Sequence, residues 1–188
     1  EQQVRRMVAE TVEKLGRLDI LFNNAGIGQR PTPLHQLATE DWQALLDVDL
    51  HGAFFCAREA LRVMVPQRSG KIINIASVWG HSASSRLQPC PSYNAAKGAL
   101  VNLTREMAYC YAPYGINVNA ICPGFIKTKI GDNCSDDPEW VKQAVPLVPL
   151  GRIGLPSEVK GLALLLASDA GSYITGDCIA VDGGYLAG

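Results

Sequence analysis

The sequence has no excess of charge of either sign and no long hydrophobic run. Its 17 basic and 18 acidic residues leave a net charge of -1, which does not favour a nucleic-acid or anionic-membrane partner. The longest aliphatic run, residues 161–167, is far shorter than the roughly 20 apolar residues that cross a bilayer. No basic stretch followed by an apolar segment opens the chain, and we therefore expect no secretory signal.

The sequence also lacks the spacing of a metal site or of a disulfide framework. Its three histidines show no ligand spacing, and its six cysteines form no C-x-x-C pair. The cysteines are scattered at positions 56, 90, 110, 122, 134 and 178. We expect reduced thiols, no metal and a cytoplasmic protein.

What remains is the composition of one globular domain. Hydrophobic residues make up 47% and charged residues 19% of 188 residues, enough for a sizeable core in a single domain over residues 1–188. The chain starts with Glu1, inside an apolar helical pattern over residues 4–15 that Gly16 ends. Because a domain rarely begins within an element, we expect the chain to be a fragment.

Short apolar runs alternate with helical patterns along the chain. The expected strands are residues 18–22, 71–77, 116–121 and 178–182. The expected helices are residues 4–15, 39–65 with Thr39 as the N-cap and Pro66 as the stop, 93–114, one near Trp140 and one from Pro156. This alternation predicts an α/β fold, a doubly wound parallel sheet covered by helices on both faces.

Several chemically active side chains follow the carboxyl ends of these strands, where ligands of such sheets bind. They are the residues 23–26, Ser77, Tyr93 and residues 123–128. Residues 125–152 are rich in proline and glycine, and we expect a substrate loop there, mobile over residues 129–145. The sequence predicts that all of these converge on one rim.

Tyr93 and Lys97 are four residues apart and share one face of the expected helix. A tyrosine hydroxyl has a pKa near ~10, and an ammonium nearby favours the phenolate and lowers that pKa. The alternative is that Tyr93 packs on the core and Lys97 is a solvated surface residue.

The chain resembles the classical short-chain dehydrogenase/reductase family in five motifs, which occur in the family's order and spacing. They are Asn23-Asn24-Ala25-Gly26, Ser77 at a strand end, Tyr93-x-x-x-Lys97, the run from Pro123 to Thr128, and the closing Val181-Asp182-Gly183-Gly184. The resemblance covers essentially the whole chain. It implies a Rossmann-like sheet and an oxidoreductase that interconverts a secondary alcohol and a ketone with NAD or NADP.

The resemblance also implies roles for individual residues. Tyr93 would be the general acid/base, Lys97 would hold the nicotinamide ribose, and Ser77 would hydrogen-bond the substrate oxygen. The residues implied to line the cofactor are Asn23, Ala25, Gly26, Tyr93, Lys97, Pro123, Gly124, Ile126 and Thr128.

Two departures from the family bear on catalysis. Asp49 stands where the family usually has an asparagine whose carbonyl holds a water connected to the lysine. Asp49 would keep that backbone role, while its charge would raise the Tyr93 pKa; a solvated helix residue is the alternative. The loop over residues 78–91 is longer than in many relatives, and we expect Ser82, Ser84 and Ser85 in it to be solvated rather than catalytic.

A third departure is the lack of the family's glycine-rich phosphate loop and of its first strands. The strand over residues 18–22 would then have an unpaired edge, and these 188 residues would bind dinucleotide poorly. A truncated, non-catalytic remnant and an epimerase or dehydratase on the same fold therefore stay open as alternatives. The choice between NAD and NADP cannot be read.

Substrate and assembly are predicted only by resemblance. The small-molecule alcohol or ketone would be a sugar, a polyol or a sugar acid, with 3-oxoacyl-carrier-protein reductase activity as the alternative. A homodimer or homotetramer would form through residues 39–65 and 92–113, as it does in relatives. Their surplus apolar side chains are Leu45, Leu46, Phe54, Phe55, Leu61, Leu100, Leu103 and Met107.

Overall fold

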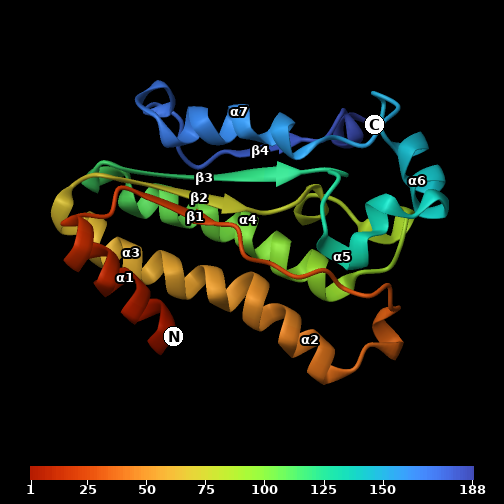
Figure 1. The fold of residues 1–188 in the computed structure, drawn as a ribbon, viewed down its shortest axis with the longest axis horizontal. Helices are drawn as coiled ribbons and strands as arrows, with labels where there is room; N and C mark the ends of the chain where they lie inside the picture. The colour runs from red at the N-terminus through yellow and green to blue at the C-terminus, as the bar shows by residue number, and fades with distance from the viewer.

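The described residues form one parallel sheet with helices on both faces (Figure 1). The structure is a computed structural model that describes the backbone throughout and the side chains of residues 1–84, 86–131 and 134–188. The strand order is β1-β2-β3-β4, and every neighbouring pair is parallel. The α/β, doubly wound prediction is confirmed.

The strands differ from the predicted ranges by only a few residues. They are β1 (Ile20–Asn23), β2 (Gly70–Ile75), β3 (Ile116–Pro123) and β4 (Cys178–Val181). β3 continues through Pro123 because that residue closes the strand beside β4, where it is paired with Val181. β2 ends at Ile75, two residues before the predicted end, and Ser77 follows it in extended backbone.

Helix α1 (Gln2–Leu15) ends at Gly16, which adopts a left-handed φ of 79°. The predicted single helix over residues 39–65 is wrong in detail. It consists of α2 (Thr39–Leu46), a π-helical turn (Asp47–Gly52) and α3 (Ala53–Gln67). Thr39 is the first helical residue and not the cap. Pro66 lies inside the last turn, and the helix ends instead at Arg68, whose φ is 53°.

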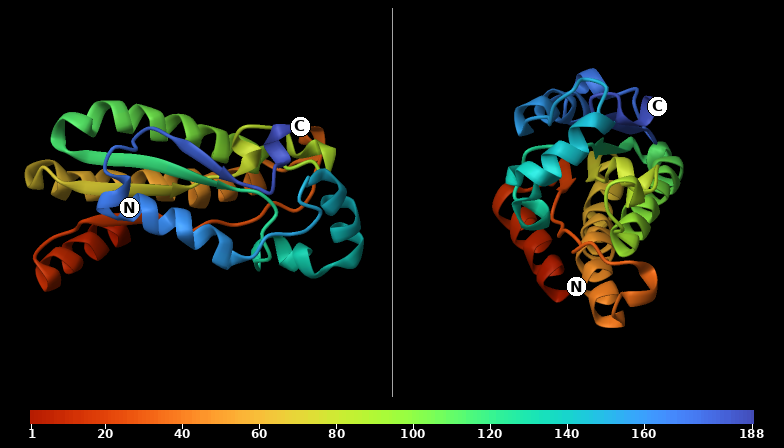
Figure 2. Two further views of the ribbon diagram at one scale, coloured as in Figure 1. Left: turned by 90° about the horizontal axis from the view of Figure 1, so that it is seen from above. Right: turned by 90° about the vertical axis from the view of Figure 1, so that its right-hand side faces the viewer.

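Helices α3 and α4 (Pro91–Tyr111) cover one face of the sheet, and α7 (Pro156–Ala167) covers the other (Figures 1 and 2). Pro156 is the first residue of α7 and Glu158 lies in its first turn, as predicted. Two short helices, α5 (Ile130–Asn133) and α6 (Pro138–Ala144), follow β3. α6 contains Trp140 and confirms the helix expected there.

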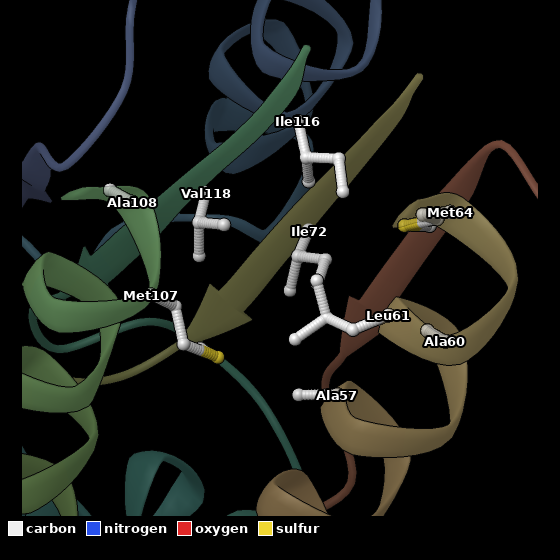
Figure 3. Packing of buried hydrophobic residues seen from close by; sticks show 9 residues of the cluster. All are labelled: Ala57, Ala60, Leu61, Met64, Ile72, Met107, Ala108, Ile116 and Val118. Carbon is white, nitrogen blue, oxygen red and sulfur yellow. The ribbon is translucent and has the colours of Figure 1, made fainter. Parts of the chain in front are cut away.

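The core between α3, α4 and the sheet is built from aliphatic and methionine side chains (Figure 3). Leu61 and Met64 of α3 and Met107 of α4 pack against Ile72 of β2 and Val118 of β3. On the opposite face, α7 contributes Leu166 against Ile73 and Ile121. Because both faces are buried, the central strands are almost continuously apolar, as parallel strands are.

Buried polar side chains, among them Asn23, Asn74 and Thr104, interrupt this apolar core. Asn74 of β2 accepts a hydrogen bond from Asn23 Nδ2 at 2.9 Å and donates one to Thr104 Oγ1 at 2.8 Å. Thr104 in turn donates to the Leu100 carbonyl at 2.8 Å. The chain of bonds joins β1, β2 and α4 just where the strands approach the rim.

No helix of the described chain is long and apolar enough to span a membrane.

Candidate active site

A pocket opens where the segments after β1, β2 and β3 meet the amino end of α4. This is the carboxyl edge of the parallel sheet, at which the sequence predicts a site. The predicted site residues that line it are Ser77, Tyr93, Gly124, Ile126 and Thr128. The predicted convergence is therefore confirmed for Ser77, Tyr93 and the segment after β3, whereas residues 23–26 do not line this pocket.

Tyr93 and Lys97 occupy the first turns of α4 and lie one above the other. The Lys97 ammonium lies 5.4 Å from the centre of the Tyr93 ring. Lys97 is buried, and its Nζ donates to the Ile75 carbonyl, at the end of β2, over 3.1 Å. The alternative of a solvated lysine is therefore wrong.

The Asp49 carboxylate pairs directly with Lys97 inside the protein. Its Oδ2 lies 3.1 Å from Lys97 Nζ, in an ion pair whose angles fall outside those of a hydrogen bond. Its Oδ1 accepts the Ile27 backbone N–H at 2.8 Å. Asp49 is only 1% exposed, so the alternative of a solvated helix residue is wrong. Asp49 thus contacts Lys97 through its side chain, in addition to the backbone role that the sequence predicts for it.

The π-helical turn explains why Asp49 faces inward. A π-turn accommodates one more residue than an α-turn and rotates the side chains that follow, and such turns recur at functional sites. Within Asp47–Gly52, Asp47 is exposed whereas Asp49 is buried. No residue type in this segment predicts the turn, and the expected uninterrupted helix missed it.

The Tyr93 hydroxyl is harder to ionise than a free tyrosine. Burial raises its pKa above the ordinary value of 10.0, a hydrogen bond with Ser77 lowers it, and the charge of Asp49 raises it. The net shift of the Tyr93 pKa is upward because burial is its largest cause, and Lys97 is not among the groups that shift it. The expectation that Lys97 lowers this pKa therefore stays a prediction. The expectation that Asp49 raises that pKa is confirmed.

Ser77 is held at the pocket wall by the turn that follows it. Its Oγ accepts the Trp79 backbone N–H at 3.1 Å, and this bond caps the turn Val78–Gly80. Ser82 donates to the Val78 carbonyl, and Ser84 is buried and accepts the Cys90 N–H at 3.1 Å. Ser84 is therefore structural and not solvated as expected. The Ser85 side chain lies outside the described residues.

The predicted cofactor-lining residues take different places around the rim. The Asn23 side chain is committed to the core through Asn74, whereas Ala25 is exposed. A Cβ on Gly26 would lie 3.1 Å from Asp49 Oδ2, and one on Gly124 would lie 2.8 Å from Asp182 Cα. Glycine thus allows close backbone approach at both positions. Pro123 closes β3 immediately before Gly124.

The loop after β1 and the short helix α5 touch through glycines. A Cβ on Gly28 would lie only 2.6 Å from the Gly131 backbone nitrogen. Gly131 itself has a φ of 65°, which favours glycine. The expected mobility of residues 129–145 stays a prediction, and within that range the side chains of Asp132 and Asn133 lie outside the described residues.

Several pocket-lining residues were missed from the sequence, among them Gln29, Trp79, Gln88 and Trp140. The Trp79 ring lies edge-on to Tyr93, with 6.0 Å between the ring centres. Trp140 Nε1 donates to Gln88 Oε1 at 3.1 Å. Their position just after strand ends, or in the loop before Tyr93, was the only available signal. No group of three or more potential metal ligands occurs among the described side chains.

Comparison with known proteins agrees with this geometry. Residues 1–186 match the family model described as Enoyl-(Acyl carrier protein) reductase. The chain is 40% identical over 185 residues to a 3-oxoacyl-[acyl-carrier-protein] reductase of Synechocystis, covering 98% of this chain and 71% of the relative. It is 38% identical over 187 residues to cis-4-hydroxycyclohexanecarboxylate dehydrogenase of Sinomonas cyclohexanicum, covering 100% of this chain and 73% of the relative.

A solved structure extends the likeness to three dimensions. Gluconate 5-dehydrogenase from Burkholderia cenocepacia J2315, in complex with NADP and tartrate, superposes with a TM-score of 0.93 at 38% identity. The match covers 100% of this chain and 72% of that one. With the serine, tyrosine and lysine assembled at the carboxyl edge of a parallel sheet, the chain belongs to the short-chain dehydrogenase/reductase family of NAD(P)-dependent oxidoreductases.

Proposed function

We propose that this chain interconverts a secondary alcohol and a ketone, with Tyr93 as the general acid/base at the reacting oxygen. The observation that carries the proposal is the convergence of Ser77 and Tyr93 on one pocket, with Lys97 buried one helical turn behind Tyr93. Ser77 and Tyr93 both offer a hydroxyl to the same oxygen, where negative charge grows during ketone reduction.

The described residues fit the nicotinamide end of NAD or NADP. An ammonium has three N–H donors, and the described contacts of Lys97 Nζ are with Ile75 O and Asp49 Oδ2. At least one N–H is therefore left for a ribose hydroxyl. Lys97 would hold the ribose there.

The segment after β3 offers a second set of contacts. Phe125 and Lys127 bond to Gly154, so the N–H and C=O of Ile126 face the other side and have no backbone partner within the described chain. This amide pair suits a carboxamide, and the Thr128 hydroxyl lines the same pocket. We therefore assign Ile126 and Thr128 to the carboxamide, and Ala25, Gly26 and Gly124 to the wall beside it.

When bound, the cofactor supplies or accepts the hydride. The chain's residues handle the proton and the developing charge. During ketone reduction the Tyr93 hydroxyl donates its proton to the substrate oxygen, and during alcohol oxidation the phenolate takes that proton. Ser77 holds the oxygen within reach of Tyr93. The contacts of Lys97 Nζ with Ile75 O and Asp49 Oδ2 hold the ammonium in place.

The substrate class and setting of the enzyme are also proposals. The gluconate dehydrogenase and the acyl-carrier-protein reductase among its relatives are consistent with a sugar, a polyol or a sugar acid, or with a 3-oxoacyl group. NADP is bound in the former. We further propose one domain over residues 1–188, a cytoplasmic location and a homo-oligomer.

Replacing Tyr93 by phenylalanine tests the catalytic assignment. We expect Tyr93→Phe to lower kcat by roughly 10²–10⁴-fold, because it removes the general acid and leaves the ring packing nearly unchanged. Reduction of a panel of ketones with NADPH and NADH would be followed by absorbance, with circular dichroism to verify the fold.

Tyr109→Phe is the matched control, because Tyr109 lies on the same helix and is 86% exposed. It should keep the wild-type rate. A Tyr93→Phe protein with the wild-type rate would overturn the proposed function.

A further inference from the structure

Gln29 reaches from the loop after β1 to the first turn of the catalytic helix. Its Oε1 accepts the Ser92 hydroxyl at 2.7 Å and the Tyr93 backbone N–H at 3.2 Å. The side chain thus satisfies one of the N–H groups that a helix leaves unpaired at its amino end. Gln29 is therefore in direct contact with the residue proposed as the acid/base.

The orientation of this amide is dictated by its partners. A backbone N–H can only donate, so the atom facing Tyr93 must be the amide oxygen and not the nitrogen. The two N–H groups of Nε2 therefore point away from Tyr93. Nε2 is buried and has no hydrogen-bond partner among the described residues, although Gln29 lines the pocket.

The backbone around Gln29 is held from two sides. The Gln29 carbonyl oxygen lies 3.8 Å from the Cys90 thiol, and the Thr32 N–H donates to the Pro89 carbonyl at 2.9 Å. The close approach of Gly28 to Gly131 fixes the preceding residue. The side chain is preorganised, and an unpaired buried donor in such a place is costly unless a ligand pairs with it.

The surroundings of Nε2 define what it can bind. Among the described side chains, none that lines this pocket is charged, and Trp79, Phe125 and Trp140 provide aromatic walls. The Trp79 indole N–H is a second buried donor without a described partner. Neutral donors suit neutral oxygen acceptors, whereas a carboxylate buried here would lack a countercharge.

We propose that Gln29 Nε2 donates a hydrogen bond to an uncharged oxygen on the carbon next to the reacting one, so that the substrate is a hydroxyketone or a vicinal diol. This inference rests on the proposed function and names its substrate class. The Gln29 side chain, which is hydrogen-bonded to the amino end of the catalytic helix, would thereby position the substrate relative to Tyr93.

Three ketones of the same chain length test the proposal in the full-length protein. Acetoin carries the adjacent hydroxyl, butan-2-one lacks it, and acetoacetate carries a carboxylate instead. We expect the wild type to reduce acetoin with at least about tenfold higher kcat/KM than either of the others, the range of one buried neutral hydrogen bond.

Two substitutions separate donation from structure. Gln29→Glu keeps an acceptor for Ser92 and the Tyr93 N–H but has no amide donor, and Gln29→Met removes both. Both should lower kcat/KM for acetoin about tenfold, mainly through KM, and Gln29→Glu should lower kcat/KM for butan-2-one by a clearly smaller factor than for acetoin. Gln36→Glu, on an exposed loop turn, is the control for added charge.

The outcomes are distinct. Equal losses on acetoin and butan-2-one would reduce Gln29 to a structural role, and a preference for acetoacetate would exclude the uncharged substrate class. Reduction of none of the ketones by the wild type would count against the proposed function. In that case quenching of Trp79 and Trp140 fluorescence by acetoin, weakened in both Gln29 variants, would still support the binding site, and unchanged quenching would overturn it.

Discussion

Asp49 and Lys97 form a buried ion pair, and Lys97 lies one helical turn from Tyr93, the proposed acid/base. Because Asp49 raises the pKa of Tyr93, its charge favours the protonated hydroxyl that ketone reduction consumes. Lys97, shared between Asp49 and the end of β2, holds its ammonium in one place. The Asp49 charge therefore favours the acid form of Tyr93.

Asp49→Asn is expected to move the pH profile in one direction. Removal of the negative charge lowers the Tyr93 pKa, so the acid limb of kcat/KM for alcohol oxidation, which needs the phenolate, should shift to lower pH. Asparagine can still accept the Ile27 N–H, which limits disruption of the loop. The measurement is the pH dependence of kcat/KM for alcohol oxidation from pH 6 to about 11, in which the acid limb of the variant is compared with that of the wild type.

Asp47→Asn is the matched control, since Asp47 is two residues away but exposed and paired with His51. It should leave the profile in place. An acid limb that stays fixed or moves to higher pH in Asp49→Asn would contradict the electrostatic role of Asp49.

Buried thiols predict a loss of stability in alkali. Burial raises the pKa of Cys122 from 9.0 to about 12 and that of Cys90 from 9.0 to about 11. Above pH 9 the unfolded chain loses these protons while the folded chain keeps them, so the free energy of unfolding falls as pH rises toward the folded values. Urea unfolding midpoints from pH 8 to about 11 would show the decline. Cys122→Ala should make it shallower, and an unchanged slope would refute this cause.

At the scale of the elements, the bonds from Asn23 through Asn74 to Thr104 fasten β1 and β2 to α4. Asn74→Ala would leave a buried donor on Asn23 and remove the partner of Thr104. We expect a loss of about 2–3 kcal/mol in the free energy of unfolding, as for buried groups left unsatisfied. Urea denaturation measures it, and the double variant Asn74→Ala with Thr104→Val should lose less than the sum of the single ones. Strict additivity would show that the two side chains are not coupled.

Element order and type could be predicted from the sequence, but the irregular points could not. The apolar runs of β1 to β4 and the terminal Gly16 and Pro156 obey local rules, so they were found within a few residues. The π-turn brings the Asp49 side chain to Lys97, and this tertiary contact has no signal in the local sequence. Pro66 was read as a stop because proline lacks an N–H, yet the last turn tolerates one lost bond when Leu61 and Met64 are packed.

The site shows the same division. Ser77, Tyr93 and Lys97 were located because strand ends and helical spacing place them together. The ionisation of Tyr93 could not be anticipated correctly, because its direction depends on burial and on where the Asp49 charge lies. Gln29 was missed because a single glutamine in a loop has no local signature, and its role depends on the orientation forced by Ser92 and Tyr93.

At the scale of the whole molecule, the outer faces of α3 and α4 leave an apolar groove. Four of the eight side chains expected to be surplus are buried within the single chain: Leu45, Leu61, Leu100 and Met107. The expectation that these four are surplus is therefore wrong. The groove is lined by residues such as Phe54, Val65, Leu103 and Tyr111, with the buried Leu61 and Met107 at its base, and Phe54 is 40% exposed.

The predicted homo-oligomer can be tested at this groove. We expect light scattering at micromolar concentration to show a dimer or tetramer, and Phe54→Glu to shift it to a smaller species by placing a charge on the groove. Leu15→Glu is the control, because Leu15 is 73% exposed on α1. A monomer in the wild type, or equal effects of the two variants, would contradict assembly through α3 and α4.

The contact between Gly28 and Gly131 has a consequence for how this chain can be diversified. A side chain at position 28 would collide with the backbone of Gly131, and Gly131 also has a positive φ. Neither glycine can therefore be replaced on its own, although the two belong to different segments of the chain. Laboratory evolution of the pocket should therefore keep both glycines or randomise the two positions together. Libraries should randomise Gln88 and Trp140, which line the pocket.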